Sequence, residues 1–235
     1  MSDAQFELVA TMEDRVLAKI PERVRPLFCS EGMRDIFTSL YGAHPQGTVL
    51  HNPALDIPRR RNPDPHMRVR LTNGHPGPVV GFLGGADPRK GGDDLVRSLA
   101  SEPEVFLLAA GPKAEQLDAR TLAGRYRCLG MLTGLDDFFA SIDVLMVPSH
   151  FEPFGLVVTE AAARGVPTLA RPGVGSLALL ERFGAGRAWT PGQSIAAEVH
   201  RLRSTLARTR EACARLTLEL DPDDLGNDLA RVWGA

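Results

Sequence analysis

The chain has 235 residues, of which 43% are hydrophobic and 24% charged, and its formal net charge is −2. This is the composition of a globular protein of one or two domains, and a charge so close to zero excludes a general attraction to nucleic acid. No apolar run reaches the roughly 18 residues of a transmembrane helix, and the acidic, mixed N-terminus is unlike a signal peptide. We therefore expect no membrane-spanning segment, while a peripheral membrane contact stays open.

The three cysteines, Cys29, Cys128 and Cys213, are odd in number and widely spaced. Such spacing favours a reduced, cytoplasmic protein over a disulfide framework. Because the chain also has no Cys-x-x-Cys pair and no histidine cluster, we expect no metal site.

Residues 1–75 predict a small α/β unit followed by a linker. Residues 6–20 carry an imperfect helical stripe, and strands are expected at 24–28 and 48–51. Between these strands we expect a helix over 32–41, with Ser30 as its N-cap. Residues 57–78 are rich in proline and contain the basic run Arg59-Arg60-Arg61, which predicts an exposed linker.

Residues 76–190 alternate between strand and helix patterns. Short apolar strands are expected at 78–83, 105–111, 126–130, 143–147, 166–170 and 184–189. One helix is expected to begin near residue 92, and three others are expected over 113–123, 134–141 and 155–164. Compact strand–helix–strand units imply right-handed crossovers, so we expect a Rossmann-like, doubly wound parallel sheet. Residues 191–235 are expected to be helical, over 194–220 and 223–233.

The stretch from Ile142 to Ala170 carries the strongest chemical signal. Glu152 lies in the loop after a buried strand, and Glu160 follows eight positions later inside a helix. The backbone N–H groups at 154–156 begin that helix and have no helical partner, so they are available to an anion or a hydroxyl. This combination suits a ligand with phosphates and sugar hydroxyls, although a glutamate at a helix start is often only a favourable charge.

A second ligand-binding pattern is the glycine-rich stretch GFLGGADPRKGGDDL, whose glycines let the backbone turn sharply near a ligand. It lacks the spacing of the dinucleotide fingerprint, and no acidic residue closes the strand at 105–111. A nicotinamide-dependent oxidoreductase is therefore a weak alternative, and the absence of a GxxxxGK[ST] motif excludes a P-loop.

The string PSHFEPFGLVVTEAAARGVP resembles the Glu–seven residues–Glu signature of group 1 glycosyltransferases, a retaining family with the GT-B fold. The resemblance implies that Glu152 contacts the transferred sugar, that the amides of Phe154, Gly155 and Leu156 hold sugar hydroxyls, and that Glu160 holds the ribose. The donor substrate would be a nucleotide diphosphate sugar, with no other cofactor and no metal.

The same resemblance assigns roles to two other segments. Lys90 would contact the diphosphate, with Arg89 beside it, and backbone atoms of Gly130, Met131 and Leu132 would line the base pocket. Two departures stand against catalysis. Gly85 occupies the position of a family arginine that clamps phosphate, and no glutamate follows the glycines at 173 and 175, since Glu181 comes later as a predicted surface charge.

Residues 27–56 resemble the end of the acceptor domain in this family, so we expect the donor half of a GT-B enzyme with a remnant of the other half. Two functions stay open. One is a retaining glycosyltransferase that transfers a hexose from a nucleotide diphosphate sugar, as a truncated or split enzyme. The other is a non-catalytic nucleotide-sugar-binding subunit or a degenerate relic. A separate acceptor-domain chain or a homo-oligomer would be the partner.

Overall fold

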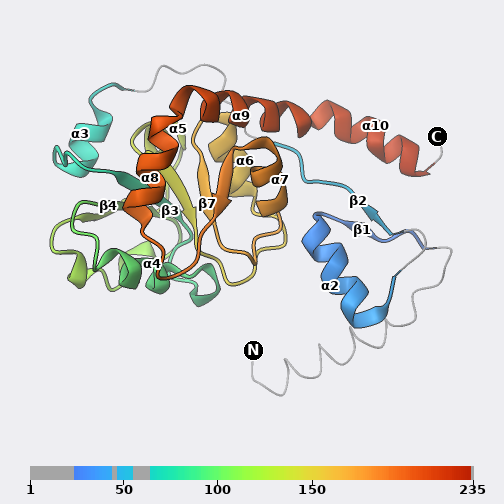
Figure 1. Ribbon diagram of the computed structural model, residues 1–235, viewed down its shortest axis with the longest axis horizontal. Helices are drawn as coiled ribbons and strands as arrows, with labels where there is room; N and C mark the ends of the chain where they lie inside the picture. The colour runs from blue at the N-terminus through green and yellow to red at the C-terminus, as the bar shows by residue number, and fades with distance from the viewer. Residues whose placement is uncertain (1–23, 44–46, 55–63, 234–235) are drawn as a thin grey trace.

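The centre of the fold is a six-stranded parallel sheet, shown in Figure 1 in a computed structural model that describes residues 24–43, 47–54 and 64–233. The strand order is β5-β4-β3-β6-β7-β8, and each neighbouring pair is parallel. The strands are β3 (Val79–Leu83), β4 (Phe106–Ala110), β5 (Tyr126–Cys128), β6 (Val144–Val147), β7 (Thr168–Ala170) and β8 (Gly186–Ala188). The predicted α/β class and parallel sheet are confirmed.

Helices cover both faces of this sheet because its central strands are buried on both sides, as parallel strands require. One apolar cluster, called the α6 cluster below, contains residues of α5 (Asp136–Ala140), α6 (Leu156–Ala163), α7 (Leu177–Phe183) and α9 (Leu206–Glu219). The other, called the α4 cluster, contains residues of α4 (Gly92–Leu99) and α8 (Ile195–Ser204) on the opposite face. The sheet is therefore doubly wound.

The expected single helix over 194–220 is two helices, because the chain breaks at Thr205 and passes from one face of the sheet to the other. Ile195 and Val199 of α8 join the α4 cluster, whereas Cys213 and Leu216 of α9 join the α6 cluster. Sequence periodicity described each helix but could not show that their apolar stripes point to different cores. α10 (Pro222–Trp233) then continues away from the sheet (Figure 1).

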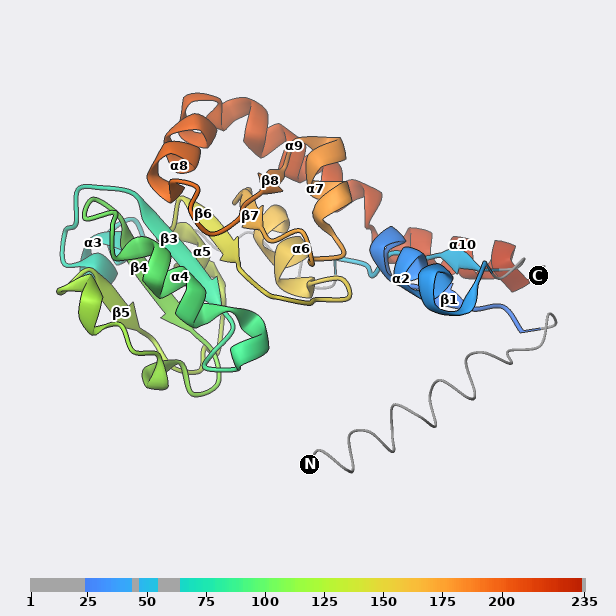
Figure 2. The same ribbon diagram turned by 60° about the horizontal axis from the view of Figure 1, so that its bottom comes forward.

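The N-terminal unit consists of β1 (Leu27–Phe28), β2 (Thr48–Val49) and α2 (Glu31–Tyr41). Ser30 caps α2 by accepting a hydrogen bond from the Met33 N–H at 3.2 Å, as expected. No residue of α2 is buried by the described chain, and Leu40 is 67% exposed. Figures 1 and 2 show α10 running alongside this unit. The helix expected over residues 6–20 lies outside the described residues.

Two local expectations are wrong. The predicted linker contains a helix, α3 (Met67–Thr72), which packs near α5, whereas Arg59 to Arg61 lie outside the described residues. The helix expected over 113–123 is a pair of 3-10 turns, η2 (Ala114–Gln116) and η3 (Arg120–Leu122), because Leu117 between them is extended, with φ −64° and ψ 125°. None of the described helices is both long and apolar enough to cross a membrane.

Candidate functional site

The candidate site lies at the carboxyl ends of β3 and β6, the two strands at which the direction of strand order reverses. Lys90 ends the short turn η1 (Pro88–Lys90) after β3, and Glu152 lies in the loop after β6. Ligands of open parallel sheets bind at such a switch point, outside the carboxyl ends of the strands. The topology thus brings together two residues that are 62 positions apart in the sequence.

Lys90 and Glu152 form a direct ion pair between Nζ and Oε2. The Glu152 side chain is 17% exposed and that of Lys90 37% exposed, so the pair is partly shielded from water. The loops that carry them are also joined by their backbones, because the His150 N–H donates to the carbonyl of Arg89 at 2.9 Å. The cation and the carboxylate therefore neutralise each other in the absence of a ligand.

Three glycines allow the loops around Glu152 to approach each other closely. A Cβ on Gly91 would overlap the carbonyl oxygen of Pro148, and one on Gly173 would overlap that of His150. At Gly175 it would overlap the carbonyl oxygen of Pro153. The Glu152 backbone is fixed in addition by hydrogen bonds to the glycines at 173 and 175, of 3.0 and 2.8 Å. The position of the carboxylate is thus set by contacts between backbones.

The start of α6 faces the same site. Gly155 is its N-cap with φ +91°, a left-handed conformation that favours glycine, and the Glu152 side chain lies against it. The backbone N–H groups of Phe154, Gly155 and Leu156 donate to no acceptor in the described chain. Phe154 itself is buried and Leu156 is 45% exposed. These three donors are available to an anion or a hydroxyl at the positive end of the helix.

Glu160 lies on α6 about one turn beyond its start and is half-buried. Its backbone carbonyl accepts a hydrogen bond of 3.1 Å from Arg164 at the end of the same helix. The two predicted glutamates thus flank the start of α6, one before it and one within it.

Arg89 and Gly85 do not form the pair of cationic side chains that would clamp a phosphate. The Arg89 side chain is 83% exposed and pairs with Asp87 at 2.7 Å, so it is not part of the Lys90–Glu152 contact. Gly85 is buried with φ +61°, and a Cβ there would overlap the carbonyl oxygen of Pro112. This conformation leaves no room for any side chain, so an arginine cannot take this position without a shift of the backbone.

Gly130, Met131 and Leu132 follow β5 at the same carboxyl edge, with β4 and β3 between β5 and β6. Gly130 has φ +64°, and its carbonyl accepts from the Gly111 N–H at 2.9 Å. Met131 is 71% exposed, whereas Leu132 packs against the α6 cluster. Their contact with a base through backbone atoms stays a prediction.

A charged cluster beside the site escaped the sequence analysis. Asp94 of α4 pairs with Arg171, which directly follows β7, at 2.7 Å, and with His150 at 3.2 Å. Burial alone would raise the pKa of Asp94, but hydrogen bonds and charge from Arg171 and Arg97 outweigh it and lower that pKa. The available signal was that Arg171 directly follows β7 and that His150 lies in the loop after β6.

The N-terminal unit closes one side of the site. The buried Ser30 donates a hydrogen bond of 2.7 Å to the Pro153 carbonyl, next to Glu152. Burial also raises the pKa of the neighbouring Cys29 thiol. A cavity of about 320 Å³ lies between α2 and the loops after β6 and β7, and Glu152 and Phe151 are among its lining residues.

This fold is that of GT-B glycosyltransferases, as solved structures show. Sucrose-phosphate synthase from Thermosynechococcus elongatus superposes with a TM-score of 0.76 at 21% identity, over 97% of this chain and 61% of that one. HepE from Anabaena, solved in complex with UDP-glucose, also has a TM-score of 0.76, at 23% identity, over 95% of this chain and 67% of that one. At these identities the likeness establishes the fold.

The chain belongs to the family described as "Glycosyl transferases group 1", whose sequence profile matches residues 65–217. D-inositol 3-phosphate glycosyltransferase 2 of Catenulispora acidiphila is 35% identical over 162 residues, which are 59% of this chain and 38% of the relative. D-inositol 3-phosphate glycosyltransferase of Geodermatophilus obscurus is 30% identical over 86% of this chain and 47% of its own. The chain thus spans less than half the length of these relatives.

Proposed function

We propose that this protein binds a nucleotide diphosphate sugar and takes part in transferring its hexose to an acceptor. The observation that carries the proposal is the Lys90–Glu152 pair beside the unpaired N–H groups of α6. Family membership supports it, as do the names of relatives that act on D-inositol 3-phosphate and of a neighbour solved with UDP-glucose.

Ligand binding would separate Lys90 from Glu152, because each of them would contact a different part of the donor. The diphosphate would take Lys90, which would neutralise the charge that develops on the leaving group. The sugar hydroxyls would take Glu152 and the N–H groups at the start of α6, and Glu160 would bind the ribose diol. Transfer would retain the configuration of the sugar, as the family resemblance implies, and would need no metal.

Calorimetric titration of the purified chain with UDP, GDP, ADP and their glucose conjugates tests the donor site. We expect one base to bind with micromolar affinity. Glu160→Ala should weaken binding about tenfold or more, the loss of a charge-assisted hydrogen bond. Glu211→Ala, at an exposed position of α9, is the matched control and should leave affinity unchanged.

Glu152→Gln sharpens the assignment because it frees Lys90 while removing the sugar-binding charge. We expect the nucleoside diphosphate to bind at least as tightly as to the wild type, and the sugar nucleotide to lose its advantage. Equal weakening of both ligands would show that Glu152 acts only as the partner that positions Lys90. No binding by any nucleotide would overturn the proposal.

A second function, a nucleotide-sugar-binding subunit without activity or a degenerate relic, is favoured by Gly85. Its backbone conformation excludes the side chain that would give a second phosphate contact. Turnover of the bound donor, measured for the chain alone and with a separate acceptor-domain chain, distinguishes the two. A second copy of the chain is the other candidate partner. The three unpaired thiols support a reducing, cytoplasmic setting.

A further inference from the structure

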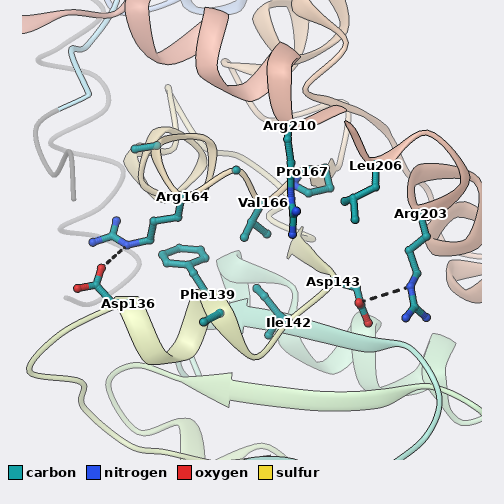
Figure 3. Close-up of a pocket in the computed structure, with 13 residues that line it drawn as sticks. Asp136, Phe139, Ile142, Asp143, Arg164, Val166, Pro167, Arg203, Leu206 and Arg210 are labelled. Atoms are coloured by element: carbon teal, nitrogen blue, oxygen red, sulfur yellow. Dashed lines mark hydrogen bonds and ion pairs between the residues drawn. The ribbon is translucent and has the colours of Figure 1, made fainter. Parts of the chain in front are cut away.

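A cavity of about 630 Å³ lies at the amino edge of the sheet, opposite the candidate donor site. The residues that line it come from α5, the starts of β6 and β7, the end of α6, and the α8–α9 junction. Figure 3 shows Arg210, Val166 and Ile142 around the central space, with the Arg164–Asp136 pair on one side of it and the Arg203–Asp143 pair on the other. Its volume lies within the roughly 300–1,000 Å³ of small-molecule sites.

The floor of this cavity is apolar. Phe139, Ile142 and Val166 are 1%, 6% and 7% exposed, and each belongs to the α6 cluster beneath. Pro167 and Leu206 complete the lining around them, and Leu206 is 37% exposed although it is a large apolar residue. An apolar group placed here would remove the exposed part of Leu206 from water and would contact the small open areas of the other floor residues.

The rim carries three arginines and two aspartates. Arg164 pairs with Asp136 at 2.8 Å, and Arg203 lies 3.6 Å from Asp143 (Figure 3). Asp143 is further occupied, because it accepts from Arg68 at 2.9 Å and from the Val79 N–H at 2.8 Å. Both carboxylates are therefore already committed to cations or donors.

The third arginine, Arg210 of α9, forms no hydrogen bond or ion pair with any residue that the structure describes. Its stem passes over Gly165, whose missing Cβ would lie 3.5 Å from the Arg210 Cγ, and Figure 3 shows its guanidinium directed between Val166 and Ile142. The rim thus has an excess of one positive charge, held over an apolar floor.

We propose that this cavity binds a small amphipathic anion, a compound with an apolar body and one carboxylate or phosphate head group. The body would lie against Leu206, Ile142 and Val166, beside the Phe139 ring that the Arg164 guanidinium covers. The head group would bind the guanidinium of Arg210, whose planar donors match either anion in a bidentate arrangement. This site is separate from the donor site, since the two lie at opposite edges of the sheet.

The test is a fluorescence titration with 8-anilinonaphthalene-1-sulfonate, an aromatic anion, with N-phenyl-1-naphthylamine as its uncharged analogue. Arg210→Glu should raise the dissociation constant of the anion about tenfold or more, as expected for a lost charge-assisted bond, and should leave that of the neutral probe unchanged. Arg208→Glu changes the same charge on the same helix, but its side chain lines a different groove, so it should have no effect.

Competition by dodecanoate and by dodecyl phosphate then distinguishes a carboxylate from a phosphate head group. Equal effects of Arg210→Glu and Arg208→Glu would show general attraction of the probe to a basic surface and would overturn the proposal. Displacement of the probe by a nucleotide sugar would show that the probe binds in the donor site, and this would also overturn the proposal. Far-UV circular dichroism of both variants confirms that they fold.

Discussion

The two edges of the sheet are built in different ways. At the carboxyl edge, loops touch backbone to backbone, and glycines at 91, 173 and 175 leave no space for a Cβ. At the amino edge, the connecting segments stand apart around a cavity of about 630 Å³ and are joined by ion pairs such as that of Arg203 with Asp143. The first edge holds Glu152 in one position, whereas at the second we expect the side chains of the exposed ion pairs to be replaceable at smaller cost.

This difference predicts that adding a single methyl group at the carboxyl edge lowers the free energy of unfolding more than removing an ion pair at the amino edge. Overpacking forces the backbone to move, whereas an exposed ion pair loses little when it is removed. The predictions below test that ranking.

The largest effect should come from Gly175→Ala. The new Cβ would overlap the Pro153 carbonyl and approach the Ser30 hydroxyl, so we expect a loss of about 3 kcal/mol in the free energy of unfolding, at the upper end for overpacking. Urea denaturation measures it. Gly134→Ala, where no atom lies within 4 Å of the new Cβ, is the control. If both variants are equally stable, the loops around Glu152 are not tightly packed.

Asp143→Ala should be the next most harmful change. It would leave the Val79 N–H without its acceptor and remove the carboxylate partner of Arg68, which keeps only carbonyl acceptors, and we expect this to cost about 2 kcal/mol. Asp143→Asn keeps an acceptor oxygen and should recover part of this loss in the same denaturation experiment. A cost above that of Gly175→Ala would reverse the ranking of the two edges.

Arg203→Ala should have a small effect on stability. Its side chain is 45% exposed and its nitrogen lies 3.6 Å from Asp143, so the pair is screened by water. We expect a change of about 0.5 kcal/mol or less, which added salt should reduce further. A loss of 2 kcal/mol would indicate that the amino edge is as tightly constrained as the other.

Acid unfolding tests the charged cluster at the carboxyl edge. Because the pKa of Asp94 is lowered in the folded state, its contribution to stability is present above the unfolded pKa of about 4 and is lost as the pH falls through the folded value. Asp94→Asn should therefore lose less stability than the wild type between about pH 4 and pH 3. Parallel pH curves for the two proteins would contradict the lowered pKa.

Much of this arrangement could be predicted from the sequence. Short apolar runs located the strands, and the strand–loop–helix pattern placed Glu152 at a carboxyl edge. The family resemblance assigned Lys90 and Glu152 to one donor molecule, whereas their direct ion pair is a finding of the structure. The site roles of both residues stay predictions until ligand binding is measured.

Other features depend on tertiary contacts that no local pattern reveals. The helix α3 lies in a proline-rich segment, and its position depends on packing against α5 and the sheet. The Asp94–Arg171 pair joins residues 77 positions apart, and the amino-edge cavity combines three separate stretches of the chain, 136–143, 163–167 and 203–210. Gly85 was recognised as a substitution, but only its φ angle and its contact with Pro112 show why no side chain fits.

The break at Thr205 also bears on how the protein folds as it is synthesised. Since α8 completes one apolar cluster and α9 completes the other, neither face of the sheet is fully covered until residues 195–220 have left the ribosome. A nascent chain that has formed all six strands would still expose apolar surface on both faces. During that interval, binding by chaperones and aggregation would compete with the docking of two helices only 24 residues long in total, 10 in α8 and 14 in α9.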